Sequence, residues 1–341
     1  MEPIRIPNIR FNSELASTII ELERVRARLH QHTRTDPPLY NDLRKLFQNL
    51  SNIMSARIEG NRTTVLDALQ GVREGQSHDE GVQEILNLEK ASAYIDEAVT
   101  EEFIFTEMFI RELHALAVSG LNREGDTTPG SYRSTEVRIA QTAHHPPGPE
   151  SVPADMRELI EFMNESMSPQ YHLLQVAIVH HRFVWIHPFD NGNGRVSRLL
   201  TYAMLVKLGF TSASGYRALN PTVVFGSDRQ AYYEHLSIAD SLRDEDIEKW
   251  CLYVLHGVAS DMKNILDLSS SAFVLNELYG PALEKAYDEA LLTGKEVAVL
   301  LKIADSGEVS AGDVKDLLPG SSAVRSKQLK SLLDRDLLYR P

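Results

Sequence analysis

Apolar residues recur along this chain mainly at intervals of three and four, and this spacing predicts a mainly α-helical fold. Alternation of apolar and polar residues, which marks a half-buried strand, is scarce. We therefore expect a helical body with few strands. The segments with helical spacing are 13–29, 40–54, the segment that resumes at Val82, 103–118, 171–185 and 199–208.

One short segment has the pattern of a strand. Val137, Arg138, Ile139 and Ala140 alternate between apolar and polar or small side chains, after a glycine-containing turn and before a proline-rich break. The sequence therefore predicts a small β-hairpin that projects from the helical body.

The pattern changes again after residues 266–271, where serines interrupt the apolar periodicity. Three helices are expected beyond this point, at Lys295–Ile303, Ser310–Leu318 and Ser321–Leu333, followed by a strand-like segment at 337–339. This order resembles a winged helix-turn-helix. We accordingly expect an N-terminal helical region at 1–95, a main body at 96–266 and a winged-helix-like domain at 275–341.

The third of these helices carries most of the basic residues of its domain. Arg325, Lys327 and Lys330 lie on it, and Arg335 lies just beyond it. A solvated helix face and a DNA-reading helix fit this pattern equally well. The net charge of −13 argues against general attraction to nucleic acid, so any contact with DNA must be local.

Composition narrows the class of protein further. No apolar run reaches the length of about 18 residues that a membrane span needs, and the N-terminus lacks a secretory core. We expect a cytoplasmic protein with no membrane partner. Its one cysteine, Cys251, lies in an apolar segment, which predicts a buried and inert thiol and excludes a disulfide within the chain.

Chemistry is concentrated in residues 187–198, HPFDNGNGRVSR. A turn at Gly192, Asn193 and Gly194 opens the apolar helix that follows, so unpaired amide groups and a cap from Asn193 are expected there. Arg195 and Arg198 lie one helical turn apart and suit a polyphosphate. His187 stands beside this phosphate site as a candidate general base.

The twelve residues resemble the signature of the Fic family, H-P-F-x-(D/E)-G-N-G-R-x-x-R. The resemblance implies a Fic-fold helical core that transfers AMP from ATP to a hydroxyl of a target protein. It implies that His187 deprotonates a Ser, Thr or Tyr hydroxyl, that Phe189 anchors the loop, and that Arg195 and Arg198 bind the β and γ phosphates. The residues expected to bind ATP are Gly192, Asn193, Gly194, Arg195, Val196, Ser197 and Arg198.

The chain departs from the signature at Asn191, where the family usually has the acid that binds Mg²⁺. An amide oxygen is a weaker ligand than a carboxylate for a hard cation. Asp190, one residue earlier, can supply the charge if its side chain faces the site. We expect Mg²⁺ bound weakly, or a preference for Mn²⁺.

A second match lies upstream. Residues 55–60, SARIEG, resemble the inhibitory motif (S/T)-x-x-x-E-(G/N) of many Fic proteins, with Ser55, Glu59 and Gly60 at its fixed positions. The resemblance implies that the Glu59 carboxylate pairs with Arg198 and takes the place of the γ phosphate. A solvated helical glutamate before a glycine cap is the alternative.

Two further segments are similar to Fic elements. The strand-like residues Val137, Arg138 and Ile139 correspond to the flap that pairs with an extended target through backbone hydrogen bonds. Tyr232 or Tyr233 corresponds to an aromatic residue near the nucleotide base, with packing as the alternative.

The sequence therefore predicts an autoinhibited protein adenylyltransferase that uses ATP with Mg²⁺ or Mn²⁺ and modifies target proteins and itself. One alternative is a nucleotide-sensing transcription regulator with a weakly active core, which Asn191 and the basic helix favour and His187 opposes. Removal of AMP by the same site is another. DNA contact through the C-terminal domain and formation of a homodimer stay open.

Overall fold

The computed structural model describes residues 3–31, 38–139, 144–210, 222–268, 274–335 and 337–338. The chain divides into two compact units, one of residues 1–33 and 44–263 and one of residues 34–43 and 264–341. The described residues are mainly helical and include no β-strand, so the predicted fold class is confirmed in its helical part.

The first helices in chain order are α1 (Glu14–Gln31), α2 (Pro38–Ile58), α3 (Val65–Glu74), α4 (Glu80–Ala98), α5 (Glu107–Val118) and α6 (Val152–Asn164). They are followed by α7 (Pro169–Ile186), α8 (Asn193–Lys207), α9 (Thr222–Ser227), α10 (Arg229–Ala239) and α11 (Asp244–Leu268). The C-terminal elements are the π-helical turn η1 (Val274–Tyr279), α13 (Gly280–Asp288), α14 (Gly294–Ser306) and α15 (Ser322–Asp334).

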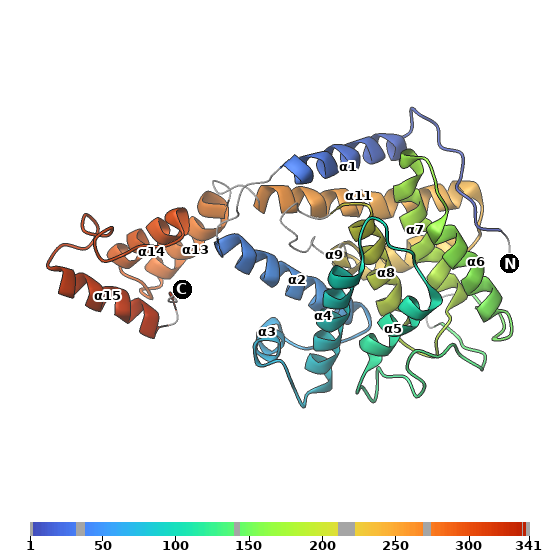
Figure 1. Cartoon of the computed structure of the whole chain (residues 1–341), viewed down its shortest axis with the longest axis horizontal. Coiled ribbons are helices and arrows are strands. Elements are labelled where there is room, and N and C mark those ends of the chain that lie inside the picture. Colours follow the sequence, from blue (N-terminus) through green and yellow to red (C-terminus); the bar gives the residue numbers. More distant parts are fainter. Residues whose placement is uncertain are drawn as a thin grey trace. The chain divides into compact units, whose positions relative to one another are not determined.

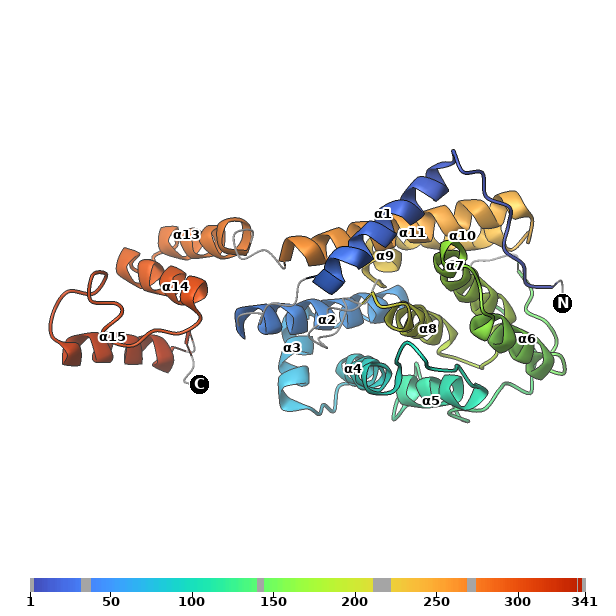
Figure 2. The same cartoon turned by 45° about the horizontal axis from the view of Figure 1, so that its top comes forward.

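Helices α7 and α8 form the centre of the first unit. Helix α8 packs against α4, α5 and α7, and both views in Figures 1 and 2 show it between α4 and α7. All residues of 173–183 and of 195–206 are buried. A helix that is buried on every side must satisfy its polar side chains within the protein, because water does not reach them.

A buried polar network meets this need where α7, α8 and α10 pack together. The Thr201 hydroxyl donates to the carbonyl of Ser197 (2.9 Å) and so accepts the Nδ1 hydrogen of His180 (2.7 Å). The Tyr232 hydroxyl then donates to Nε2 of His180 (2.9 Å). Burial, with the charge of Arg198, lowers the pKa of His180 far below its usual range, so the ring stays neutral and the network keeps one arrangement.

The C-terminal unit agrees with only part of its prediction. Helices at 295–303 and 321–333 are confirmed by α14 and α15, whereas residues 311–317 form successive turns in place of the expected second helix. The Asp313 carboxylate there accepts hydrogen bonds from both the backbone N–H (2.8 Å) and the hydroxyl (2.6 Å) of Ser310. Such local bonds compete with a regular helix.

A winged helix is therefore not confirmed. Leu337 and Leu338 are not in a strand, and Tyr339 lies outside the described residues. A small apolar core still holds the unit together, and it consists of Val299, Val314, Leu318 and Leu332.

Two of the four basic residues near α15 bind within their own unit. Arg325 donates to the carbonyls of Ala311 (2.6 Å) and Gly320 (2.5 Å), and Arg335 pairs with Glu296 at 2.7 Å. These guanidinium groups therefore stabilise turns and helix ends. Contact with DNA stays a prediction.

The expected β-hairpin is not confirmed either. Residues 131–139 form neither strand nor helix, and Ala140 lies outside the described residues. The segment is held by the Arg133 side chain, which donates to the carbonyl of Thr135 within the segment and to that of Pro147 beyond it, and no ladder between two strands is present among the described residues. Prolines at 146, 147 and 149 also lack the N–H groups that a partner strand would need.

Two expectations from composition can be checked on this fold. Cys251 is fully buried, as expected, and burial raises the pKa of its thiol. Within the part of the chain that the structure describes, no helix combines the length and the apolar character needed to cross a membrane.

The network around His180 predicts the effect of one tyrosine substitution. In Tyr232→Phe, Nε2 of His180 loses its donor and stays buried, so we expect the free energy of unfolding to fall by about 1–2 kcal/mol in urea denaturation. Tyr253→Phe is the matched control, because the Tyr253 hydroxyl is buried without a hydrogen-bond partner among the described residues. Equal losses in the two variants would contradict this assignment.

Candidate functional site

The loop that carries His187 joins the ends of the two central helices. His187 ends α7 in the left-handed conformation (φ 52°, ψ 61°), and its N–H donates to the Phe183 carbonyl (3.0 Å). Helix α8 begins at Asn193, directly after Gly192 with φ 75°. A Cβ on Gly192 would lie 2.8 Å from Val118, so both the conformation and the space require glycine.

The loop is anchored by an aromatic stack and by an amide. Phe189 is fully buried and its ring stacks on His114, with 3.7 Å between centroids, which agrees with its expected anchoring role. The Asn193 side chain accepts from the Phe189 N–H (2.9 Å) and donates to its carbonyl (2.8 Å). The prediction that this side chain caps α8 is wrong, because both of its polar atoms serve the loop.

His114 is a residue of this site that sequence reasoning missed. Its Nδ1 accepts from the Gly130 N–H (2.9 Å), so its Nε2 carries the hydrogen and donates to the Asn191 carbonyl (3.1 Å). Burial lowers the pKa of His114 to about 4 and keeps the ring in this neutral form. Nothing in the local pattern of α5 distinguishes His114 from other core residues.

The candidate base His187 is held as a neutral imidazole. Its Nδ1 lies 3.2 Å from the carbonyl of Val184, which can only accept, so the hydrogen is on Nδ1 and the lone pair on Nε2. Burial lowers the pKa of His187 to about 4, although the bond to Val184 opposes this, and the charge of Arg133 acts with burial. The ring can therefore accept a proton at Nε2 at neutral pH.

Arg198 meets the upstream segment that was singled out in the sequence. Its Nη2 lies 2.6 Å from Oε1 of Glu59, its Nε donates to the Ser55 hydroxyl (2.8 Å), and its Nη2 also donates to the Ser55 carbonyl (3.1 Å). The Arg198 side chain is only 1% exposed, whereas that of Glu59 is 25% exposed. Two segments about 140 residues apart thus share one ion pair.

The Glu59 carboxylate occupies the N-terminal end of α8. A Cβ built on Gly194 would lie 2.3 Å from its Oε1, so only the absence of a side chain allows this approach. Burial opposes the charge of Glu59, but the charge and hydrogen bond of Arg198 outweigh it and lower the pKa of Glu59. Gly60 then turns the chain with φ 99°, a conformation that favours glycine. An anionic group therefore already sits at the predicted phosphate site.

Arg195 has different surroundings from Arg198. It forms an ion pair with Glu84 (3.2 Å), and it donates to the carbonyls of Glu124 (2.6 Å) and Ala117 (3.5 Å). The amide of Asn61 in turn donates to Glu84 at 2.7 Å. Burial raises the pKa of Glu84 in spite of Arg195. Glu84 is a second residue that sequence reasoning missed.

The other predicted nucleotide ligands have mainly structural contacts. Val196 is fully buried, and the Ser197 hydroxyl donates to the Gly194 carbonyl (2.8 Å), so a phosphate at this helix end would meet backbone N–H groups. Tyr232 is buried and donates to His180. Tyr233 is partly exposed, and the guanidinium of Arg229 lies over its ring at 5.5 Å.

Asn191 and Asp190, the two residues expected to bind a metal, differ in how their side chains are bonded. The Asn191 oxygen accepts from the Gly192 N–H (2.7 Å) and its amide donates to the Gly125 carbonyl (3.2 Å), so both polar atoms of this side chain already have partners. Asp190 is exposed and is the one acidic residue of 187–198. Among the described residues there is no cluster of three His, Cys, Asp or Glu side chains that could bind a metal. The Asp190 carboxylate accepts a long hydrogen bond from the Thr135 hydroxyl (3.5 Å) and has oxygen lone pairs left for a ligand role.

The flap candidates lie in the segment next to this loop. Val137 and Ile139 are half-buried and Arg138 is exposed, and none of the three is in a helix or a strand. Arg133, a third residue that sequence reasoning missed, connects the segment to the loop, because it donates to the carbonyls of Thr135 (3.0 Å) and His187 (2.7 Å).

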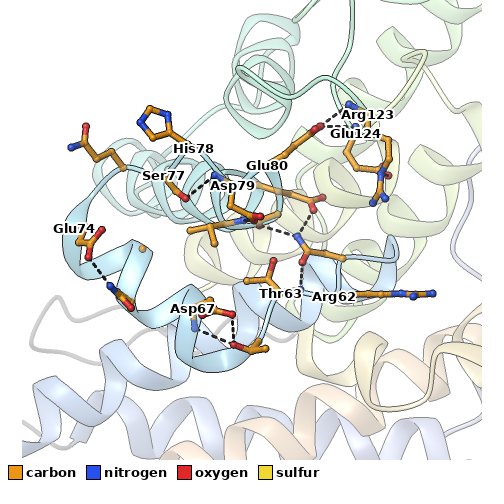
Figure 3. Close-up of a pocket in the computed structure, with 18 residues that line it drawn as sticks. Arg62, Thr63, Asp67, Glu74, Ser77, His78, Asp79, Glu80, Arg123 and Glu124 are labelled. Atoms are coloured by element: carbon orange, nitrogen blue, oxygen red, sulfur yellow. Dashed lines mark hydrogen bonds and ion pairs between the residues drawn. The ribbon is translucent and has the colours of Figure 1, made fainter.

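A separate cavity of about 830 Å³ lies between α3, the start of α4 and residues 123–124. Figure 3 shows acidic and basic side chains around it, including Asp67, Glu74, Arg62 and Arg123. None of residues 187–198 lines this cavity. This cavity is therefore not part of the site around His187.

Comparison with known proteins identifies the domain that carries this loop. Residues 104–205 match the Fic/DOC family. A protein adenylyltransferase Fic from Drosophila grimshawi is 32% identical over 194 residues, which make up 54% of this chain and 37% of that protein. The corresponding protein of Drosophila melanogaster is 31% identical and is covered over 36% of its length. The matched region thus spans little more than a third of these curated relatives.

Solved structures show the same fold. A Fic family protein from Desulfovibrio desulfuricans G20 superposes with a TM-score of 0.63 at 20% identity, over 97% of this chain and 92% of that chain. Fic-1 from C. elegans superposes with a TM-score of 0.58 at 18% identity, over 74% of this chain and 72% of that chain. The predicted signature lies inside residues 104–205, so this part of the chain is a Fic domain.

Proposed function

We propose that this chain is an autoinhibited protein adenylyltransferase, which transfers AMP from ATP to Ser, Thr or Tyr hydroxyls of target proteins and of itself. The observation that carries the proposal is the Glu59 carboxylate, which rests on Gly194 and pairs with Arg198 beside the neutral base His187. The names of the curated relatives, protein adenylyltransferase Fic, support the reaction class.

In the proposed reaction, Nε2 of His187 takes the proton of the target hydroxyl as its oxygen attacks the α phosphorus of ATP. The bond from the α phosphorus to the bridging oxygen breaks, and pyrophosphate leaves. The backbone N–H groups at the start of α8 and the Arg198 guanidinium balance the phosphate charge. The low pKa of His187 keeps the lone pair available before the substrate binds.

Arg195 has a smaller part in this proposal than the family resemblance implies. Its guanidinium is enclosed by Glu84 and two backbone carbonyls, so it would act on phosphates through its positive charge and by fixing the start of α8. Arg198 would make the direct contact, because its partner Glu59 is partly exposed and can move away.

Inhibition in this proposal is competition between two anions for one place. While Glu59 pairs with Arg198, its carboxylate occupies the position that the γ phosphate needs. Displacement of Glu59 leaves Arg198 in contact with Ser55, so the guanidinium keeps two hydrogen bonds as the phosphate arrives.

A divalent cation, Mg²⁺ or Mn²⁺, would neutralise the phosphates in this reaction. Asp190 would hold it, because both polar side-chain atoms of Asn191 already bond to Gly192 and Gly125. A single carboxylate is a sparse donor set for a protein site, and such cations commonly take their other ligands from water and phosphate oxygens.

The target would lie along residues 137–139, and its backbone would bond to the backbone groups there. Arg138 is exposed and available to a target side chain. The proposal includes a cytoplasmic location, whereas DNA binding by the C-terminal unit and homodimer formation are separate possibilities that the geometry of this site does not address.

Replacement of Glu59 tests the proposal directly. With ATP labelled at the α phosphate, we expect Glu59→Gly to transfer label to protein roughly ten- to a hundredfold faster than the parent, because a charge-assisted bond contributes about 1.5–3 kcal/mol. Glu59→Gln, which keeps the shape and loses the charge, should fall between the two.

The controls separate this proposal from its alternatives. His187→Ala in the Glu59→Gly background should abolish labelling. Equal labelling by parent and Glu59→Gly would contradict inhibition by Glu59. An absence of label in every form, together with specific retention of DNA, would favour a transcription regulator, and faster loss of AMP from labelled protein in the parent would favour AMP removal.

The metal assignment makes a second prediction. In the Glu59→Gly background, Asp190→Asn should raise the half-saturating concentration of Mg²⁺ on the order of tenfold, because it removes the available carboxylate. Asn191→Asp should lower it, since a carboxylate returns to the usual position. Identical metal titrations for the background and Asp190→Asn would rule out Asp190 as the ligand.

A further inference from the structure

Arg133 joins the segments on both sides of the site through backbone carbonyls alone. Its Nε donates to the carbonyl of His187 (2.7 Å), and its Nη2 lies 3.3 Å from that of Ile186. The remaining donors reach the carbonyls of Thr135 (3.0 Å) and Pro147 (2.5 Å). Four carbonyls from three segments therefore converge on one planar guanidinium.

The charge of Arg133 is unusual for a buried group. The residue is 3% exposed, and no acidic side chain lies within ion-pair distance of it among the described residues. Burial lowers its pKa, and more distant acids oppose this shift. Burying a cation without a carboxylate partner costs folding free energy. We therefore explain Arg133 by the backbone carbonyls that its guanidinium fixes in place.

Arg133 first stabilises the backbone conformation of the candidate base, His187. His187 has φ 52°, a left-handed conformation that residues with a Cβ rarely adopt. Its three polar backbone and ring contacts are the N–H bond to Phe183, the Nδ1 bond to Val184 and the carbonyl bond from Arg133. The last of these is the only one that comes from outside α7 and its end.

Arg133 also fixes the segment expected to bind the target, residues 137–139. Thr135 and Pro147, whose carbonyls accept from Arg133, lie on either side of residues 137–139. The backbone N–H of Arg133 also donates to the carbonyl of Pro188 (2.9 Å). A movement of the segment that contains residues 137–139 would therefore also move His187, through Arg133.

We propose that Arg133 is a positioning residue that couples the flap segment to the base, so that His187 faces a hydroxyl presented along residues 137–139. This inference rests on the proposed transferase function. Lysine cannot replace it, because one ammonium group does not reach four carbonyls in a plane. ATP binding does not depend on it, since Arg133 contacts none of residues 192–198.

Kinetics in the Glu59→Gly background test this coupling. We expect Arg133→Lys and Arg133→Gln to lower kcat for transfer on the order of a hundredfold, because small misplacement of a reacting group has effects of this size, while the KM for ATP changes less than about twofold. Arg111→Gln is the matched control, because Arg111 lies over the Tyr132 ring at 4.8 Å and bonds to none of the loop carbonyls. It should leave kcat unchanged.

A second measurement does not depend on activity. In the parent chain without ATP, NMR titration of the histidine rings should show the pKa of His187 rising above about 4 in Arg133→Gln, because a nearby positive charge is lost while burial still holds the pKa below its usual range. Arg133→Lys, which keeps the charge, should move it less. The buried His180 is the internal reference and should keep its low pKa. The charged or titratable groups that face His187 are Arg133, Glu59 and His144.

The outcomes are distinguishable. If Glu59→Gly transfers no label, the proposed function fails, and the titration still tests the contact between Arg133 and His187. If Glu59→Gly is active and folded Arg133 variants keep its kcat, the coupling is overturned. An unchanged His187 pKa in a folded Arg133→Gln variant overturns it as well.

Discussion

Two buried guanidinium groups on α8 govern the arrangement of this protein, because a buried charge must be paired or it destabilises the fold. Arg195 pairs with Glu84 of α4, and Arg198 pairs with Glu59 at the end of α2. Each pair ties a different upstream segment to the same helix. The pairs are not equivalent, since the Glu84 side chain is 3% exposed and that of Glu59 is 25% exposed. Arg195 is therefore enclosed in the fold, whereas the proposed inhibition requires Arg198 to change partners.

The loop between α7 and α8 depends on a related constraint, the neutrality of buried imidazoles. Protonated His114 could not accept from Gly130, so the hydrogen bond that orients the ring stacked on Phe189 requires the neutral form. Protonated His180 could not accept from Tyr232 for the same reason. His187 shares the low pKa, but its Nε2 is left with a lone pair that no described contact uses. The same burial that stabilises the core thus prepares one ring to accept a proton.

Much of the helical fold and the pair of Glu59 and Arg198 could be predicted from sequence, because both leave local patterns: apolar spacing in one case and two short motifs in the other. His114, Glu84 and Arg133 leave none. Each acts through contacts with residues 54 to 111 positions away, as between Arg133 and His187 or between Glu84 and Arg195. The prediction of a helix at 310–318 was wrong although its local pattern is clear. The apolar spacing fits a helix, but the hydrogen bonds from Ser310 to Asp313 favour turns.

The partners of Arg198 explain how a buried ion pair can serve as an exchangeable contact. Breaking a buried pair usually leaves one charge without a partner, which is strongly unfavourable. Here the Ser55 hydroxyl and carbonyl bond to the same guanidinium, so Arg198 keeps two acceptors when Glu59 leaves. In the proposed exchange, Glu59 would move toward water, because its side chain is already partly exposed and Gly60 follows it in the chain. An arriving phosphate would then replace one carboxylate at the N-terminus of α8, where the free N–H groups and the helix dipole stabilise any anion.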